Sequence, residues 1–353
     1  MTRTHSRPWL AAALILGTIV SMMSSVAQAQ LAYRLTAIVD PSSANYPYAT
    51  GLNNKGEVVG FAETFGTRAF HWKAGVYTDY GSGSSGSSGY RSFASVNDRS
   101  IIAGTQNFAP TNFLLRQDTY VPVNVSTADG NPTIYYLNNR NQVVGRAQTK
   151  VFIWQRGTTT FLDNLPNSDQ FAPRPGGIND HGVVSGTSGE INTRRAVIWK
   201  NGSVMALDQL PGADVSDGGD INNFEQIVGV AIGPSGATRA FFWDDGVTTE
   251  LPPLTAPNVY AATPGAINDW GVVVGTTYIS GGLGGIATVW LAGRPINLNT
   301  LIDPRDPLQG QVTLQSADFI NERGQIVAFG YDATANRSVR YLLTPTYRPQ
   351  PNP

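Results

Sequence analysis

Three carboxylates, Asp214, Asp217 and Asp220, stand three residues apart in one glycine-rich stretch. Oxygen ligands in a flexible loop suit Ca²⁺, and two of the three could instead act as an acid and base pair. The spacing does not match an EF-hand loop, and surface turns are commonly rich in Asp. The sequence leaves three alternatives open here: a Ca²⁺ site, a catalytic pair, or a solvated turn.

Other catalytic side chains are scarce. After the N-terminal segment the chain has only two histidines, His71 and His181, and it has no cysteine. These histidines fall in different repeats, so neither a Ser-His-Asp triad nor a multi-histidine metal site is expected. No Walker loop, zincin helix or nucleophile elbow is present. Beyond the carboxylates, the chain offers no familiar catalytic pattern.

A repeat supplies the elements that position these residues. An apolar residue, Asn, a turn, a paired apolar step and then Gly recur seven times, with the Asn at positions 53, 97, 138, 179, 222, 268 and 321. Successive positions differ by 41 to 53 residues, the period of four-stranded propeller blades. Residues 219–222, 226–231, 239–243 and 247–251 of the fifth copy read as four short strands. The sequence therefore predicts an all-β, seven-bladed β-propeller of four-stranded blades.

The Asn and Gly residues of the repeat are expected to be structural. Asn53-Asn-Lys-Gly56 has the composition of a tight hairpin, in which Asn accepts bonds from the turn and Gly takes a positive φ. Where that Gly is missing, Asn141, Ser100 and Glu225 take its place. The second Gly, seven residues after the Asn, lies inside a strand. That position indicates a bulge or a close backbone approach.

The third strand of each repeat carries one large apolar residue. Trp occupies this position in five copies, and the second and seventh copies have Leu115 and Leu342 instead; the tryptophans are Trp72, Trp154, Trp199, Trp243 and Trp290. Such residues are expected to pack between adjacent blades and exclude water there. The rival interpretation is an aromatic ligand cage.

The two ends of the chain contain complementary parts of one repeat. Tyr33–Asp40 resembles a fourth strand with no repeat before it, and the last copy stops after the third strand at Leu343. The N-terminal strand can therefore complete the last blade and close the ring. Closure removes the bare sheet edges that an open array would leave.

The combination of Asn-x-x-Gly-x-Val-Val-Gly with Arg-Ala-Phe-x-Trp resembles the bacterial extracellular HAF repeat, named for a His-Ala-Phe triplet. Arg68-Ala69-Phe70 and Arg239-Ala240-Phe241 stand at that triplet, with Arg in place of His. The resemblance covers residues 33 to 345. It implies an exported, propeller-like protein and carries over no activity and no catalytic residues.

The N-terminal segment predicts export. Arg3 and Arg7 precede an apolar run, and Ala27-Gln28-Ala29 reads as a cleavage site, so residues 1–29 are expected to be a signal peptide. The propeller domain is then 30–345, followed by a Pro-rich tail, 346–353. Cleavage leaves 22 basic against 25 acidic residues, which argues against nucleic-acid binding. We expect a secreted or periplasmic monomer with no membrane span and no cofactor other than the candidate Ca²⁺.

Variable loops gather on one face of the predicted ring. Loops between the second and third strands, and those between blades, emerge together, as is typical of a recognition surface. The leading hypothesis is an exported, non-catalytic scaffold that binds an extracellular protein or a glycan through this loop face. A carboxylate-dependent glycan hydrolase or lyase, and a structural module of the envelope or matrix, are the alternatives. The candidate binding residues are Tyr48, Tyr90, Arg91, Arg174, Asp217 and Tyr260.

Overall fold

The computed structural model describes residues 30–40, 47–64, 66–82, 89–107, 111–126, 132–166, 168, 173–280 and 284–348. The predicted signal peptide and residues 349–353 lie outside these ranges. Within the described part, no helix is long and apolar enough to cross a membrane.

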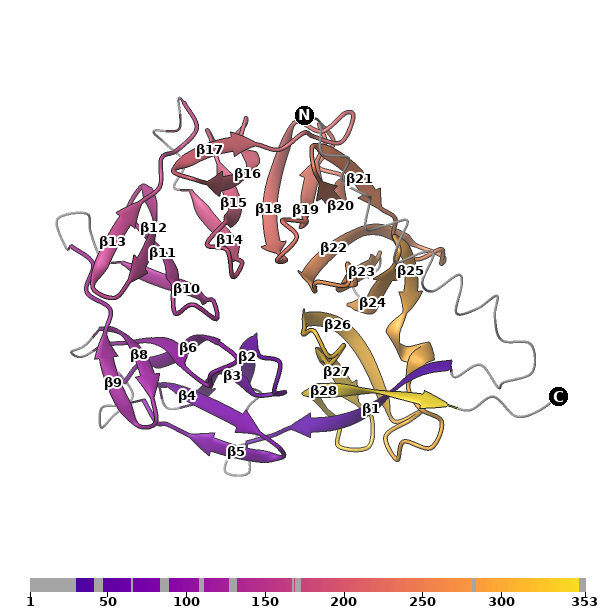
Figure 1. Ribbon diagram of the computed structural model, residues 1–353. Coiled ribbons are helices and arrows are strands. Elements are labelled where there is room, and N and C mark those ends of the chain that lie inside the picture. Colours follow the sequence, from indigo (N-terminus) through magenta and orange to yellow (C-terminus); the bar gives the residue numbers. More distant parts are fainter. Residues whose placement is uncertain are drawn as a thin grey trace, which may run out of the picture.

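The described residues form seven four-stranded antiparallel sheets, and the sheets are arranged as blades around a central opening (Figure 1). In blades 1 to 6 the chain runs from an inner first strand to an outer fourth strand. Blade 1 contains β2 (Tyr48–Leu52), β3 (Val58–Thr64), β4 (Gly66–Lys73) and β5 (Val76–Asp79), and blade 2 contains β6 (Arg91–Val96), β7 (Ile102–Gln106), β8 (Asn112–Arg116) and β9 (Thr119–Pro122). Blade 3 contains β10 (Thr133–Leu137), β11 (Val143–Ala147), β12 (Lys150–Gln155) and β13 (Thr158–Phe161), and blade 4 contains β14 (Arg174–Ile178), β15 (Val184–Ser188), β16 (Arg195–Lys200) and β17 (Ser203–Ala206). Blade 5 contains β18 (Val215–Ile221), β19 (Ile227–Ile232), β20 (Thr238–Asp244) and β21 (Val247–Leu251), and blade 6 contains β22 (Val259–Ile267), β23 (Val273–Ile279), β24 (Gly285–Leu291) and β25 (Arg294–Asn297). The predicted fold class is confirmed.

Blade 7 joins the two ends of the chain, as predicted. It contains β26 (Val312–Ile320), β27 (Ile326–Asp332), β28 (Arg337–Arg348) and, as its outer strand, β1 (Gln30–Ile38). A short 3-10 helix, η2 (Leu298–Leu301), precedes this blade. Between η2 and β26, Asp306 accepts a hydrogen bond from Leu35 N at 2.8 Å and so helps to hold β1 in place. One boundary is corrected: β28 runs to Arg348, so residues 346–348 belong to the closing blade rather than to the tail.

The large residue of each third strand packs between blades, as predicted. Trp199 of blade 4 lies in a cluster with Leu162 of blade 3 and donates from Nε1 to the carbonyl of Asp163 at 2.6 Å. In blade 7, however, the residue at this position is Leu343, not Leu342. Leu343 pairs with Ile326 at the start of the second strand, as Trp199 pairs with Val184, whereas Leu342 is one residue out of register and faces the opposite side of the sheet.

The hairpin between the first and second strands has the same construction in every blade. The side-chain oxygen of Asn53 accepts bonds from Lys55 N and Glu57 N, both at 3.0 Å, and the equivalent Asn of each other blade accepts the same two bonds. The fourth residue of the turn has a positive φ throughout, including Ser100 at 59°, Asn141 at 60° and Glu225 at 65°. Both predicted features of the turn are confirmed.

The glycine inside the second strand lies beside a bulge in the first strand, with blade 7 as the exception in which Ala328 stands at this position. At Gly229 an added Cβ would lie 2.3 Å from the carbonyl oxygen of Asp217 and 2.6 Å from the Phe241 ring. The first-strand carbonyl and the third-strand side chain together leave no room for a side chain. The predicted close backbone approach is confirmed.

Candidate functional site

The three carboxylates singled out in the sequence do not form a shared site. Asp214 is exposed, and Asp217 accepts two bonds from Arg194, at 2.7 and 2.9 Å. Asp220 accepts bonds from Ile221 N and, across the blade boundary, from Ile267 N. Burial raises the pKa of Asp220 to about 6, against the opposing effect of these two amides. Among the described residues, no three His, Asp or Glu side chains form a group able to hold a metal ion, so the predicted Ca²⁺ cluster is not formed.

A glycan hydrolase or lyase of the kind considered would need two carboxylates facing a substrate. Asp217 and Asp220 are engaged as described, and Asp318, a further acid of the inner strands, bonds to Arg340 and to Ser316. The histidines offer no alternative, because His71 lies in blade 1 and His181 in blade 4. His71 is 3.8 Å from the buried Glu57 carboxylate, and burial lowers its pKa. The three carboxylates Asp217, Asp220 and Asp318 therefore connect different segments of the scaffold.

Of the six predicted loop-face residues, two are held in internal contacts. Arg91 donates from Nε to Gln106 at 2.9 Å and lies over the Tyr120 ring, while Asp217 pairs with Arg194. Arg174 is exposed at the start of β14. The remaining three, Tyr48, Tyr90 and Tyr260, have 46%, 40% and 63% of their surface exposed.

These tyrosines belong to a larger arc. Tyr260 lies in blade 6, Tyr48 in blade 1 and Tyr90 at the entry to blade 2, and Tyr331, which the sequence analysis did not single out, fills the gap in blade 7 with 37% of its surface exposed. All four lie at the loop end of their strands. The arc of Tyr260, Tyr331, Tyr48 and Tyr90, called here the tyrosine arc, spans four consecutive blades.

Two members of the tyrosine arc, Tyr48 and Tyr331, are restrained by their neighbours. The ring of Tyr48 stacks on Phe61 with centroids 5.2 Å apart, and the Arg340 guanidinium lies 5.7 Å from the Tyr48 centroid. Tyr331 donates its hydroxyl to Asn336 at 2.6 Å. Aromatic side chains restrained in this way lose little conformational entropy when a partner binds.

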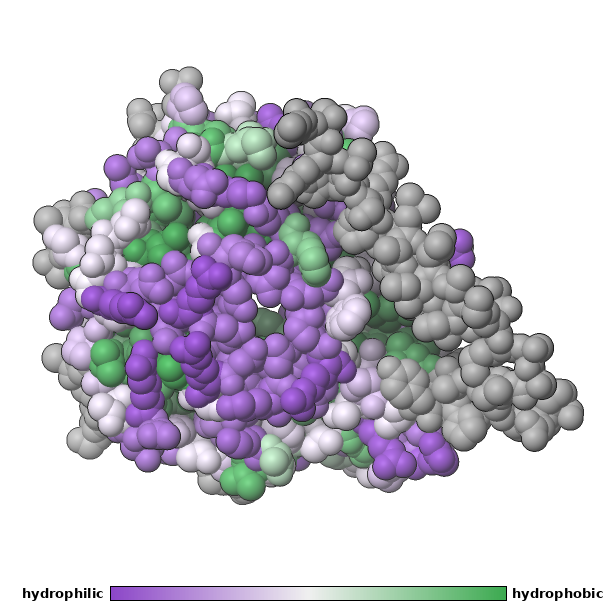
Figure 2. Space-filling model, in the orientation of Figure 1, coloured by the Kyte–Doolittle hydropathy of each residue, from purple (hydrophilic) through white to green (hydrophobic). Residues whose placement is uncertain are grey.

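The opposite face, formed by the hairpins between first and second strands, carries two closed rings of hydrogen bonds. In the inner ring, Asn53 donates from Nδ2 to the carbonyl oxygen of Asn97, the next Asn does the same, and Asn321 closes the circle onto Asn53 at 2.8 Å. Each ring Asn thus shapes its own turn and ties its blade to the next. Figure 2 shows hydrophilic residues surrounding the central opening on the face in view.

The second ring uses the residue after each Asn. Its backbone N–H donates to the side chain of the equivalent residue in the next blade, all the way round; the members are Asn54, Asp98, Asn139, Asp180, Asn223, Asp269 and Glu322. Amides and carboxylates alternate, but seven positions cannot alternate without a break. The break places Glu322 next to Asp269, and burial together with that neighbouring charge raises the pKa of Glu322 to about 7.

The third residue of each hairpin projects outward and forms what we call the crown. Its members are Arg323, Lys55, Arg99, Arg140, His181, Phe224 and Trp270, all exposed. Every crown residue donates its backbone N–H to the ring Asn of its own turn, so all seven occupy equivalent positions. The crown was not singled out from the sequence, although the change of residue type at one fixed place in the repeat was a readable signal.

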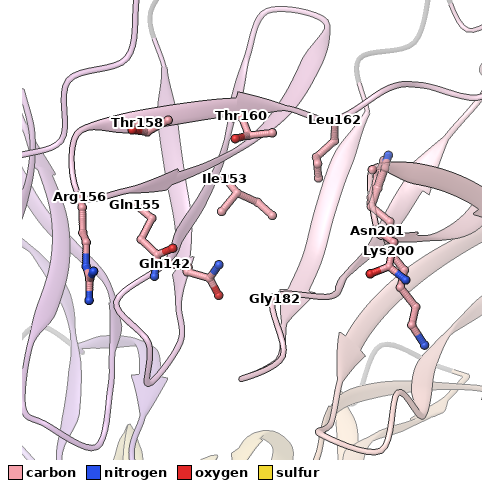
Figure 3. Close-up of a pocket in the computed structure, with 12 residues that line it drawn as sticks. Gln142, Ile153, Gln155, Arg156, Thr158, Thr160, Leu162, Gly182, Lys200 and Asn201 are labelled. Atoms are coloured by element: carbon pink, nitrogen blue, oxygen red, sulfur yellow. The ribbon is translucent and has the colours of Figure 1, made fainter.

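A groove of about 430 Å³ opens on the same face between blades 3 and 4 (Figure 3). The amides of Gln142 and Gln155 lie on one side of it, and Lys200 and Asn201 lie on the other. Its lining residues are Gln142, Ile153, Gln155, Arg156, Thr158, Thr160, Leu162, Gly182, Trp199, Lys200, Asn201 and Gly202. None of them is acidic or a histidine, so the groove offers hydrogen-bonding groups rather than an acid and base pair.

The fold and the two closed rings define the chain as a seven-bladed β-propeller. Its sequence matches no known protein-family model and no curated protein. Among solved structures it is similar to YCF48 bound to a D1 peptide, with a TM-score of 0.53 at 8% identity, covering 91% of this chain and 99% of that one. YCF48 from Cyanidioschyzon merolae gives a TM-score of 0.56 at 10% identity, covering 88% and 99%. The extracellular domain of a putative one-component system from B. thetaiotaomicron gives 0.52 at 10% identity, and the match covers 88% of this chain but only 40% of that one. At these identities the similarity concerns the fold alone.

Proposed function

We propose that this chain is an exported binding propeller of the HAF-repeat type, which recognises a protein partner through the tyrosine arc on its loop face. The observation that carries the proposal is the arc itself: four exposed tyrosines on four consecutive blades, two of which, Tyr48 and Tyr331, are restrained by a stacked ring and a hydrogen bond. Tyr is among the residues that contribute most to binding at protein interfaces.

Two further observations support a binding role. The carboxylates that a hydrolase would use are engaged with Arg194, Arg340 and backbone amides. In addition, YCF48 has a similar propeller fold, and the match covers 99% of the YCF48 chain. That structure contains a bound D1 peptide. A propeller of this size therefore suits peptide recognition.

Affinity capture from the extracellular and envelope fractions of the producing organism tests the proposal. The bait is the purified protein, compared with the triple variant Tyr48→Ala, Tyr90→Ala, Tyr260→Ala. A matched control carries Val76→Ala and Val247→Ala, which remove exposed apolar side chains from the outer strands. We expect a partner protein that the control retains and the triple variant loses. Equal capture by both variants, or retention of a glycan alone, contradicts the proposal.

A further inference from the structure

The crown on the hairpin face divides by chemistry into two sectors. Four cations occupy consecutive blades 7, 1, 2 and 3, namely Arg323, Lys55, Arg99 and Arg140. Within the described part of the chain, none of these four forms an ion pair with a carboxylate; Lys55 only donates to the Ser100 hydroxyl at 3.0 Å. Four equivalent cations without carboxylate partners form a sector that attracts negative charge.

The second sector is aromatic. Phe224 and Trp270 stand on the adjacent blades 5 and 6, with 61% and 72% of their surface exposed. The indole of Trp270 is not free to rotate, because its Nε1 donates to the carbonyl oxygen of Glu322 at 3.1 Å. Neither residue contributes to the core of its blade, so burial in the fold does not explain them.

We propose that the crown is a second interaction surface, opposite the tyrosine arc, and that its partner is an acidic protein segment carrying at least one large apolar side chain. The acidic groups pair with the cationic sector, and the apolar side chain packs on Phe224 and Trp270. Trp and Arg are the side chains most enriched at the energetic centres of protein interfaces.

The charge distribution favours such a segment over a uniform polyanion. Directly inside the crown lies the second ring, with its half-buried carboxylates Asp98, Asp180, Asp269 and Glu322. A nucleic acid or a polyuronate laid across the face would bring its evenly spaced charges over these carboxylates. Asp98 and Glu322 lie inside the cationic sector itself, in blades 2 and 7. A short peptide can place its acids on the outward-projecting cations of the crown, away from these carboxylates, and its apolar group on the other sector.

The groove between blades 3 and 4 extends this surface outward. It begins beside the crown, since Gln142 follows Arg140 by two residues and Gly182 follows His181 directly. Gln142 already accepts a bond from Asn138, and Gln155 donates to the Arg140 carbonyl. The Nε2 group of Gln142, the Oε1 atom of Gln155 and the hydroxyls of Thr158 and Thr160 offer hydrogen bonds to the backbone of an extended segment leaving the cationic sector. The crown and groove together provide a charged contact, an apolar contact and a track for main-chain hydrogen bonds.

Selection from a display library of random 12-residue peptides tests the proposal, with the purified protein as target and Arg99→Ser, Arg140→Ser as the counter-target. We expect the selected peptides to be acidic and to contain a Trp, Phe, Tyr or Leu. Their affinity should fall about tenfold or more in the counter-target and in Trp270→Ala. Trp270→Phe, which keeps an aromatic ring, should recover most of the loss, and Tyr90→Ala on the opposite face should have no effect.

The proposal is overturned if selected peptides bind the crown variants and the native protein equally, if they lack an acidic bias, or if no peptide is enriched over the counter-target. Heparin and single-stranded DNA serve as competitor probes, and binding of either that is as tight as the peptides and insensitive to Trp270→Ala would identify a polyanion surface instead. Melting temperatures of all variants, measured alongside, separate lost binding from lost folding.

Discussion

At the scale of single residues, the Asn of each repeat has three hydrogen-bonding tasks. The side-chain oxygen of Asn179 accepts from His181 N and Val183 N, and its Nδ2 donates to the carbonyl oxygen of Asn222 in the next blade. All three bonds require a side chain that has both a carbonyl oxygen, which accepts two bonds, and an N–H donor. This explains why the residue recurs seven times without any role in catalysis.

Replacing Asn179 by Ala should destabilise the protein by roughly 2–3 kcal/mol, because it leaves the buried Val183 N–H without its partner and removes the bond to the Asn222 carbonyl, which keeps only its bond from Glu225 N. Denaturant unfolding measures the change. His181→Ala in the same turn is the control, since that side chain is exposed, and should stay within about 0.5 kcal/mol. A similar, small effect for both variants would show that the ring bonds contribute little.

Glu322 should make the stability depend on pH. Its pKa is about 7 in the folded protein against 4.5 in the unfolded chain, so the folded state binds the proton more tightly. The stabilisation from this group is complete below pH 4.5 and is lost as the pH rises through 7. Glu322→Gln removes the charge beside Asp269 and should raise the unfolding free energy at pH 8 by about 1 kcal/mol, after allowance for solvent screening.

The gain from Glu322→Gln should shrink towards pH 5, where Glu322 is itself mostly neutral. Asp180→Asn is the matched control, because Asp180 already lies between the amides Asn139 and Asn223 and should gain nothing at pH 8. Thermal melts at both pH values test this. If Glu322→Gln gives the same change at pH 5 and pH 8, the two acids do not repel each other as described.

At the scale of elements, the second strand is limited by the space beside the first. Gly229→Ala would push a methyl group against the Asp217 carbonyl and the Phe241 ring, and should cost about 2–3 kcal/mol or more. Gly233→Ala, which meets a single carbonyl oxygen at 3.1 Å, should cost less than about 1 kcal/mol. Equal unfolding free energies of the two variants would mean that the bulge yields easily.

Sequence periodicity could identify the strands but not every side-chain direction. Leu342 and Leu343 are both apolar neighbours in β28, and only pairing with Val327 and Ile326 shows that Leu343 takes the position of the tryptophans. The prediction of a shared aspartate site was wrong for a related reason. Whether Asp217 meets Arg194 and Asp220 meets Ile267 depends on bulges and on the neighbouring blade, which spacing along the chain does not encode.

At the scale of the whole molecule, the repeat allowed the closed ring of blades to be predicted, but not most of the candidate binding residues. Every blade repeats its own turn and packing residues, and the phase of the two chain ends matches the observed pairing of β1 with β28. Three members of the tyrosine arc, Tyr48, Tyr90 and Tyr260, were predicted because they lie where a variable connection enters the first strand of a blade. Tyr331 was missed because it lies at the end of a second strand, and the crown was missed because it lies inside the repeat.

Residues that recur in every blade hold the ring together, whereas side chains that differ between the copies face the solvent. The Asn of each blade is buried, whereas the crown residue two positions later is exposed and changes from Arg to His, Phe or Trp. Stability and recognition should therefore respond to different substitutions in the same short turn.

Site-specific photocrosslinking can show whether the tyrosine arc binds a protein. A photoreactive phenylalanine is placed one position at a time at Tyr48, Tyr90 and Tyr260, and at Val76, Met205 and Val247 as exposed controls on the outer strands. Irradiation follows incubation with the extracellular fraction of the producing organism. We expect one discrete protein adduct that is shared by the three tyrosine positions and absent from the controls. Adducts that are absent everywhere, or equally frequent at all six positions, would contradict this expectation.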